Sequence, residues 1–240
     1  MSCPTCGAFD MGADHTCSPV VATTPAPGRH MPPPPPPPPA PAAEIGKAVS
    51  TASHDAFGAL RKLSVDPVGG LPEAYASLGP DRARAAGVAL CVGFALLTTL
   101  GVLVGAKRLL PDGIPLGGSG LADVLKTFLV LLVLPAAFAA ASFATRKVLR
   151  AAPPISADLM TAGAALIPSG AATVAAGLLG LGNLEIVLAL YLFALCYLVL
   201  LLYGGLTGIG GVASRVAVPA VPLLILAAGW IAKVVIAALL

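Results

Sequence analysis

The chain has 240 residues, of which 57% are hydrophobic and only 10% are charged, and its mean hydropathy is +0.92. Because soluble domains carry about 25% charged residues, this composition excludes an ordinary water-soluble protein and favours a membrane protein. The formal net charge is +3, and residues 86–240 hold 8 of the 14 basic and 4 of the 11 acidic side chains. This basic excess flanks the apolar stretches instead of covering one soluble face, so no nucleic-acid partner is expected.

Residues 1–17, MSCPTCGAFDMGADHTC, combine three cysteines with a histidine. Cys3 and Cys6 are two residues apart and are followed by a glycine, a pattern in which two thiolates reach one zinc ion around a tight turn. A zinc ribbon normally has a second Cys-x2-Cys pair, but Val20 stands where the partner of Cys17 would be. The pattern therefore predicts a degenerate zinc ribbon. No cleavable signal peptide is expected, since a basic region followed by an apolar one is lacking.

A histidine is the best candidate for the fourth donor of this head. The predicted structural Zn²⁺ site has the ligands Cys3, Cys6, His15 and Cys17. His30 is a more distant substitute for His15, and Asp10 and Asp14 are poorer zinc donors than thiolate or imidazole. A segment of about 17 residues cannot build a hydrophobic core without such a staple. A head that has lost its metal is the alternative.

Residues 18–56 are rich in proline and alanine and include eight consecutive prolines, Pro32 to Pro39. Such a run favours a polyproline II rod of roughly 25 Å, at about 3.1 Å per residue. We interpret residues 18–56 as a disordered linker that holds the head away from the membrane. A docking ligand for an aromatic groove is the alternative interpretation of the proline run.

Apolar and charged residues are mixed between Glu44 and Arg84. The first half of this stretch is predicted to form a short amphipathic helix on the lipid headgroups. Pairs such as Asp66-Pro67 and Gly79-Pro80 then interrupt any long helix. Residues 57–84 are therefore predicted to form a juxtamembrane segment without a core of its own.

Residues 85–240 are predicted to form an all-α membrane domain of five helices. Five stretches are long and apolar enough to cross a bilayer, which takes about 20 residues, and they lack the alternation of a membrane strand. The predicted spans are residues 85–106, 124–145, 159–179, 184–203 and 216–240. The distribution of Lys and Arg between the loops predicts a cytoplasmic N-terminus and an exoplasmic C-terminus in the cell membrane. The head cysteines would then be reduced.

Glycines and prolines within the spans predict how the helices pack. Gly101 and Gly105 form a Gly-x-x-x-Gly motif in the first span, a spacing that lets helix backbones approach closely. The third span is rich in Gly and Ala and is predicted to lie at the centre of the bundle. Pro135 and Pro168 are predicted to bend the second and third spans.

Ionisable residues are rare within the spans. Asp123, Asp158 and Glu185 stand at or beside predicted helix starts, where a carboxylate complements the helix dipole. Lys233 lies inside the last span and can extend its ammonium group outward. We predict no buried acid–base pair in the membrane domain, and all three histidines precede the first span. A catalytic site is therefore not expected.

Three stretches carry a family resemblance: DPVGGLPEAYASLGP, ISADLMTAGAALIPSG and LYLFALCYLVLLLYGGLTGIGGVASRVAVP. Together they make residues 65–240 resemble the bacterial members of the Yip1 family of five-span membrane proteins. The resemblance implies a cytosolic N-terminus, an exoplasmic C-terminus and a non-enzymatic role as a membrane scaffold or adaptor.

Two functions are consistent with these features. The first is a multi-pass scaffold or adaptor whose zinc-binding head contacts a cytosolic protein partner. The second is a small transporter or channel, formed by a homo-oligomer of the five helices around a pathway shaped by Pro135 and Pro168. In both cases the lipid bilayer is the surrounding partner, and an intramembrane enzyme is disfavoured.

Overall fold

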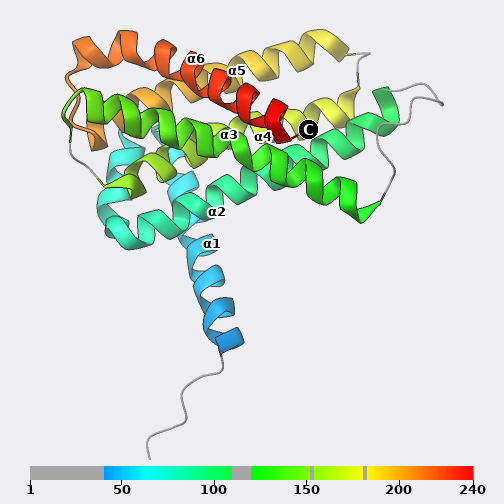
Figure 1. The fold of residues 1–240 in the computed structure, drawn as a ribbon, viewed down its shortest axis with the longest axis horizontal. Helices are drawn as coiled ribbons and strands as arrows, with labels where there is room; N and C mark the ends of the chain where they lie inside the picture. Colours follow the sequence, from blue (N-terminus) through cyan, green and yellow to red (C-terminus); the bar gives the residue numbers. More distant parts are fainter. Residues whose placement is uncertain (1–40, 110–119, 152–153, 181–182, 240) are drawn as a thin grey trace, which may run out of the picture. The chain divides into compact units, whose positions relative to one another are not determined.

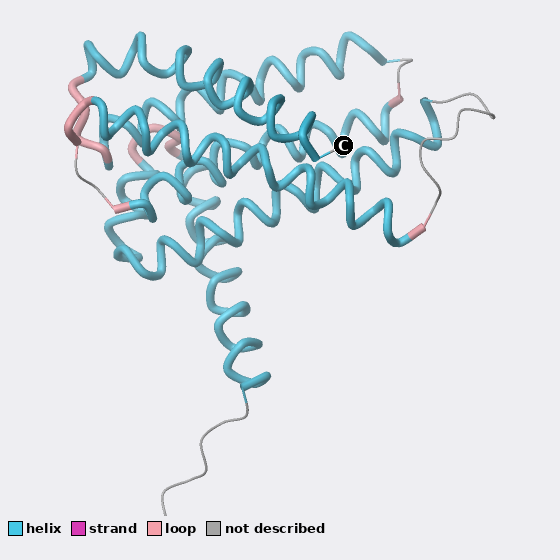
Figure 2. The backbone as a smooth tube through the Cα atoms, in the orientation of Figure 1, coloured by secondary structure: helices cyan, strands magenta, loops and turns pink. Residues whose placement is uncertain are grey.

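The computed structural model describes residues 41–109, 120–151, 154–180 and 183–239, and these residues form helices and short connections without a strand (Figures 1 and 2). The helices are α1 (Pro41–Val65), α2 (Gly70–Leu109), α3 (Leu121–Val148), α4 (Ile155–Leu179), α5 (Leu184–Gly204), the π-helical turn η2 (Gly205–Ile209) and α6 (Ser214–Leu239). The all-α prediction is confirmed for these ranges. The predicted head, residues 1–17, and the first part of the predicted linker lie outside the described residues.

Five helical segments among the described residues are long and apolar enough to cross a membrane. They are Gly70–Gly105, Leu121–Val148, Ile155–Leu179, Leu184–Ile209 and Ser214–Ala238. The prediction of five long apolar helices is thereby confirmed. Their outer faces carry large apolar side chains, and Leu226 and Trp230 are 70% and 67% exposed. So much exposed apolar surface is unfavourable in water and suits lipid, which supports a multi-pass membrane protein.

The structure extends the helical part of the chain toward the N-terminus. Residues 41–56 belong to α1, so this part of the linker predicted over residues 18–56 is helical. The helix is favoured locally by alanines and by Glu44 in its first turn. Its second half is held by burial, because Ala59 and Leu63 are 3% and 2% exposed, and α1 packs against α2. Its first half extends away from the bundle (Figure 1).

Helix α2 also begins earlier than predicted. It starts at Gly70, whereas the first span was predicted from residue 85. The chain does separate α1 from α2 around Asp66-Pro67, as predicted, but Gly79-Pro80 only interrupts α2 locally. Gly79 has φ 73° and ψ 170°, a backbone conformation that suits glycine, and helical structure resumes after it.

The pair formed by α2 and α4 is the centre of the packing, and α4 also contacts α3 and α5. The two backbones approach closely where glycines face each other. A Cβ atom on Gly177 would lie 2.4 Å from the carbonyl oxygen of Gly101 and 3.1 Å from the amide nitrogen of Gly105. These two glycines of the predicted motif therefore lie at the α2–α4 contact, where a side chain would force the helices apart.

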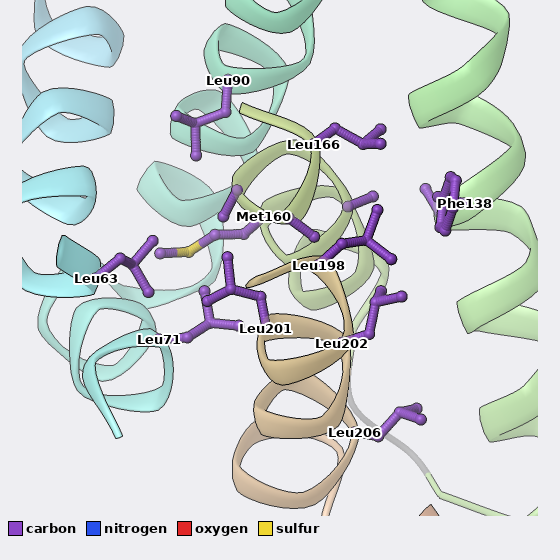
Figure 3. Packing of buried hydrophobic residues seen from close by; sticks show 14 of the residues in the cluster. Leu63, Leu71, Leu90, Phe138, Met160, Leu166, Leu198, Leu201, Leu202 and Leu206 are labelled. Atoms are coloured by element: carbon purple, nitrogen blue, oxygen red, sulfur yellow. The ribbon is translucent and has the colours of Figure 1, made fainter. Parts of the chain in front are cut away.

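A continuous apolar core surrounds this pair. Leu63 of α1, Leu71 of α2, Met160 of α4 and Leu201 of α5 gather from four helices (Figure 3). Each of these side chains is at most 2% exposed. Helix α6 joins the core through one stripe of buried residues at helical spacing. Its buried residues are Ala217, Val221, Leu224, Ala228 and Ala232.

Helices α3 and α4 are continuous across their internal prolines. Pro135 is buried within α3, and Pro168 is half-buried within α4. The bends expected at these two positions stay a prediction.

Candidate functional site: a polar cluster at the proximal end

Polar contacts gather at one end of the bundle. We call it the proximal end: α2, α4 and α6 begin there, and α3 and η2 finish there (left in Figure 1). The positions follow from the chain's path, because successive spans run in alternate directions. Last-turn residues of one span therefore meet first-turn residues of the next.

A buried ion pair joins α3 to α4 at this end. Arg146, in the last turn of α3, and Asp158, in the first turn of α4, have side chains only 3% and 1% exposed. The Arg146 Nε donates to Asp158 Oδ1 at 2.8 Å, and its Nη2 donates to Oδ2. Ser142 Oγ donates to the same Oδ1 at 2.7 Å. The carboxylate thus faces a guanidinium group and a hydroxyl in a site closed to solvent.

This pair corrects the expectation that the membrane domain holds no buried acid–base pair. Asp158 was predicted to serve only the dipole of its helix, whereas the structure directs its carboxylate at Arg146. The physical reason is the short connection between α3 and α4, which places their ends side by side. The sequence did contain a signal for this ion pair. A basic residue stands in the last turn of one span, and an acidic residue follows 12 positions later in the first turn of the next span.

Further polar contacts tie the neighbouring helices together. Tyr75 of α2 and Ser156 of α4 share a hydrogen bond of 3.0 Å between their hydroxyl groups. Tyr197 of α5 donates its hydroxyl to the backbone carbonyl oxygen of Leu63 in α1. These two contacts link four helices within the same region of the fold.

Two ion pairs connect α1 to α2. Arg82 donates through Nε to Asp55 Oδ2 at 2.9 Å and through Nη2 to Oδ1 at 2.5 Å. The Asp55 side chain is 6% exposed, although that of Arg82 is 59% exposed. Lys62 and Glu73 form a second pair at 2.9 Å, and both of their side chains are open to solvent. The Arg82–Asp55 pair is the better fixed of the two, because it is bidentate and its acid is buried.

A glycine-rich π-helical turn completes the proximal end. The stretch GGLTGIGG lies between the predicted spans 184–203 and 216–240, but Gly205–Ile209 is helical, and the Gly210 N–H donates to the Gly205 carbonyl at 2.8 Å. A Cβ on Gly205 would lie 2.4 Å from Thr161 Cγ2, and one on Gly208 would lie 2.3 Å from Pro72 Cγ. Lack of side chains lets this turn press against α2 and α4, which explains why the stretch is not an open loop.

The predicted zinc ligands Cys3, Cys6, His15 and Cys17 are outside the described ranges. Within the part of the chain that the structure describes, no group of three or more His, Cys, Asp or Glu residues is placed to hold a metal ion. Pro168 lines an apolar cavity of about 290 Å³ between α1, α4 and α5, together with Phe193 and Tyr197. The polar contacts described at the proximal end therefore join neighbouring helices to one another.

The chain matches no family model, and no curated protein or solved structure is significantly similar to it. The resemblance to the Yip1 family therefore stays a prediction.

Proposed function

We propose that this chain is a non-enzymatic membrane scaffold or adaptor, with the bundle as its anchor and a cytosolic zinc-binding head as its contact with a protein partner. The observation that supports the proposal is the buried Arg146–Asp158 pair. An ion-coupled transport pathway normally has ionisable groups that exchange partners with the transported ion. Here the buried charges bind each other and join α3 to α4, as expected of a rigid support.

The proposed orientation has the proximal end in the cytoplasm. Basic side chains at this end include Arg61, Lys147, Arg150 and Arg215, all exposed. Lys and Arg are enriched in short cytoplasmic segments of membrane proteins. A bundle with five spans then has an exoplasmic C-terminus and a head in the reducing compartment, where free thiolates are available to a metal.

Metal content per chain tests the proposed head. The full-length protein is purified under reducing conditions without chelator, alongside Cys3→Ser, Cys17→Ser and His15→Ala. We expect about one zinc ion per wild-type chain, as four protein ligands close a structural site, and loss of the ion in all three variants. Cys196→Ser is the matched control, because this cysteine lies in α5, and it should keep the metal. Absence of zinc from the wild type would contradict the proposed head.

A small transporter or channel is the second candidate, and the apolar cavity beside Pro168 favours it. Solute flux into liposomes that contain the purified protein separates the two functions. The scaffold proposal expects no protein-dependent flux. Reproducible flux that Pro168→Ala alters would replace the scaffold with a transporter.

A further inference from the structure

A cavity of about 330 Å³ lies beside the buried ion pair at the proximal end. Its wall comes from the end of α3, the described residues that flank it in the α3–α4 connection and the start of α4. The lining residues are Phe143, Arg146, Lys147, Arg150, Ala151, Pro154 and Ile155. Three of these described lining residues are basic and none is acidic, so the cavity is an electropositive site with apolar walls.

The positive potential of the cavity comes from its two exposed cations. The charge of Arg146 is balanced by Asp158. Lys147 and Arg150 are exposed, and neither takes part in an ion pair within the described ranges. The Lys147 Nζ lies 5.4 Å from the centroid of the Phe143 ring, which positions the ammonium group at the cavity wall.

The backbone at Arg150 provides an independent observation. Arg150 has φ 57°, in the left-handed region. Its N–H donates to the Lys147 carbonyl at 3.2 Å, and the Ala151 N–H donates to the Arg146 carbonyl at 2.9 Å. This pair of hydrogen bonds is a Schellman motif, in which the position of Arg150 is usually glycine. The chain thus holds an arginine where glycine would fit the backbone with less strain.

We propose that this cavity binds the phosphate group of an anionic membrane lipid, with Lys147 and Arg150 as the two cations. A volume of about 330 Å³ is at the small end of ligand pockets, which span about 300–1,000 Å³, and suits a glycerophosphate headgroup. Basic pockets between membrane helices are suited to anionic headgroups. Ile155, 51% exposed at the rim, offers apolar contact to the start of the acyl chains.

The proposed lipid contact accounts for an arginine at a backbone position that favours glycine. Its side chain lies at the cavity because the left-handed turn directs the chain from α3 into α4 at that point. The inference rests on the membrane placement of the bundle, and it is independent of the zinc-binding head and of the scaffold role. Absence of zinc from the purified protein would contradict the proposed head but would not bear on the lipid site.

The test titrates the purified full-length protein, in an uncharged detergent, with short-chain phosphatidylglycerol and detects bound lipid by native mass spectrometry. Matched titrations use phosphatidylcholine and inorganic phosphate. The variants are Lys147→Gln, Arg150→Gly and the double variant. Arg215→Gln is the control, because Arg215 is an exposed cation at the same end and does not line the cavity.

We expect each single variant to weaken phosphatidylglycerol binding about fivefold and the double variant about 30-fold, which corresponds to about 1 kcal/mol per cation. Arg215→Gln should change the Kd less than twofold, and phosphatidylcholine should bind weakly to every variant. Arg150→Gly should also unfold at the same or a higher detergent concentration than the wild type, because glycine suits the turn. Stable folding together with weakened binding separates a ligand contact from a structural role.

Three results would overturn the proposal. The first is unchanged phosphatidylglycerol binding in the folded double variant. The second is an equal loss in Arg215→Gln, which would indicate general surface charge. The third is inorganic phosphate binding as tightly as the lipid and with the same dependence on Lys147 and Arg150, which would make the site one for a free anion.

Discussion

Removal of one partner from the Arg146–Asp158 pair should destabilise the bundle strongly. Asp158→Asn keeps the volume of the side chain but leaves the Arg146 guanidinium, which is 3% exposed, without its counter-charge. Loss of one member of a buried ion pair typically costs about 3–5 kcal/mol. A loss of that size lowers the folded-to-unfolded ratio by roughly 150- to 4,000-fold, at about 1.4 kcal/mol per factor of ten.

The double variant Arg146→Met/Asp158→Leu should recover most of this loss. It removes both charges and leaves apolar side chains of similar size, a replacement that is often neutral or stabilising. The cycle of Arg146→Met, Asp158→Leu and the double variant isolates the coupling between the partners. Ser142→Ala removes one donor to the charged oxygen, at 2.7 Å, and should cost about 1.5–3 kcal/mol.

Unfolding in mixed micelles by titration with sodium dodecyl sulfate, followed by circular dichroism, measures these free energies. Asp123→Asn is the matched control: this acid is in the first turn of α3 and only half-buried, so its loss should cost less than about 1 kcal/mol. An Asp158→Asn protein as stable as the wild type would refute the reasoning. So would a double variant as unstable as the single ones.

Three other predictions follow from the packing and topology. Gly101→Ala should cost about 1–3 kcal/mol in the same unfolding assay, since the new Cβ would lie 2.6 Å from the Thr173 backbone. Gly93→Ala is the control and should be neutral or stabilising, because its Cβ would lie 3.6 Å from a flexible side chain. Equal changes in the free energy of unfolding for the two variants would contradict the close α2–α4 contact. Asp55→Asn should accelerate amide hydrogen exchange in the second half of α1 more than Lys62→Gln does, because only Asp55 is a buried partner; the reverse order would contradict this account. A reporter enzyme active only outside the cell should be active when fused to the C-terminus, and activity after fusion at the N-terminus instead would reverse the proposed orientation.

The five spans could be predicted from the sequence because their signal is local. A stretch of about 20 apolar residues must satisfy its backbone within itself in lipid, so length and composition suffice to identify a helix. The Gly-x-x-x-Gly motif at Gly101 and Gly105 was a local signal of the same kind, although only the fold identifies α4 as the partner helix.

The limits of the helices were harder to predict because they depend on burial against other segments. Residues 70–84 are polar enough to resemble a loop, but α2 packs against the second half of α1 there. Residues 44–54 of α1 are mostly exposed, so local helix propensity, not burial, extends the helix through them. The GGLTGIGG stretch resembles a turn in the sequence, and its helical structure also depends on contacts with other helices. Its glycines serve contact with Thr161 and Pro72, which the local sequence does not show.

The amino-acid sequence by itself determined that this protein is a helical chain with five apolar segments, since lipid acts on each segment separately. Only the tertiary structure decided which charges meet. Arg146 and Asp158 each resembled an ordinary helix-end residue, and the close approach of α3 and α4 made them a buried pair. The same approach left Lys147 and Arg150 facing a cavity. Electrostatic interactions depend on distance and burial, and both are set by how distant segments pack.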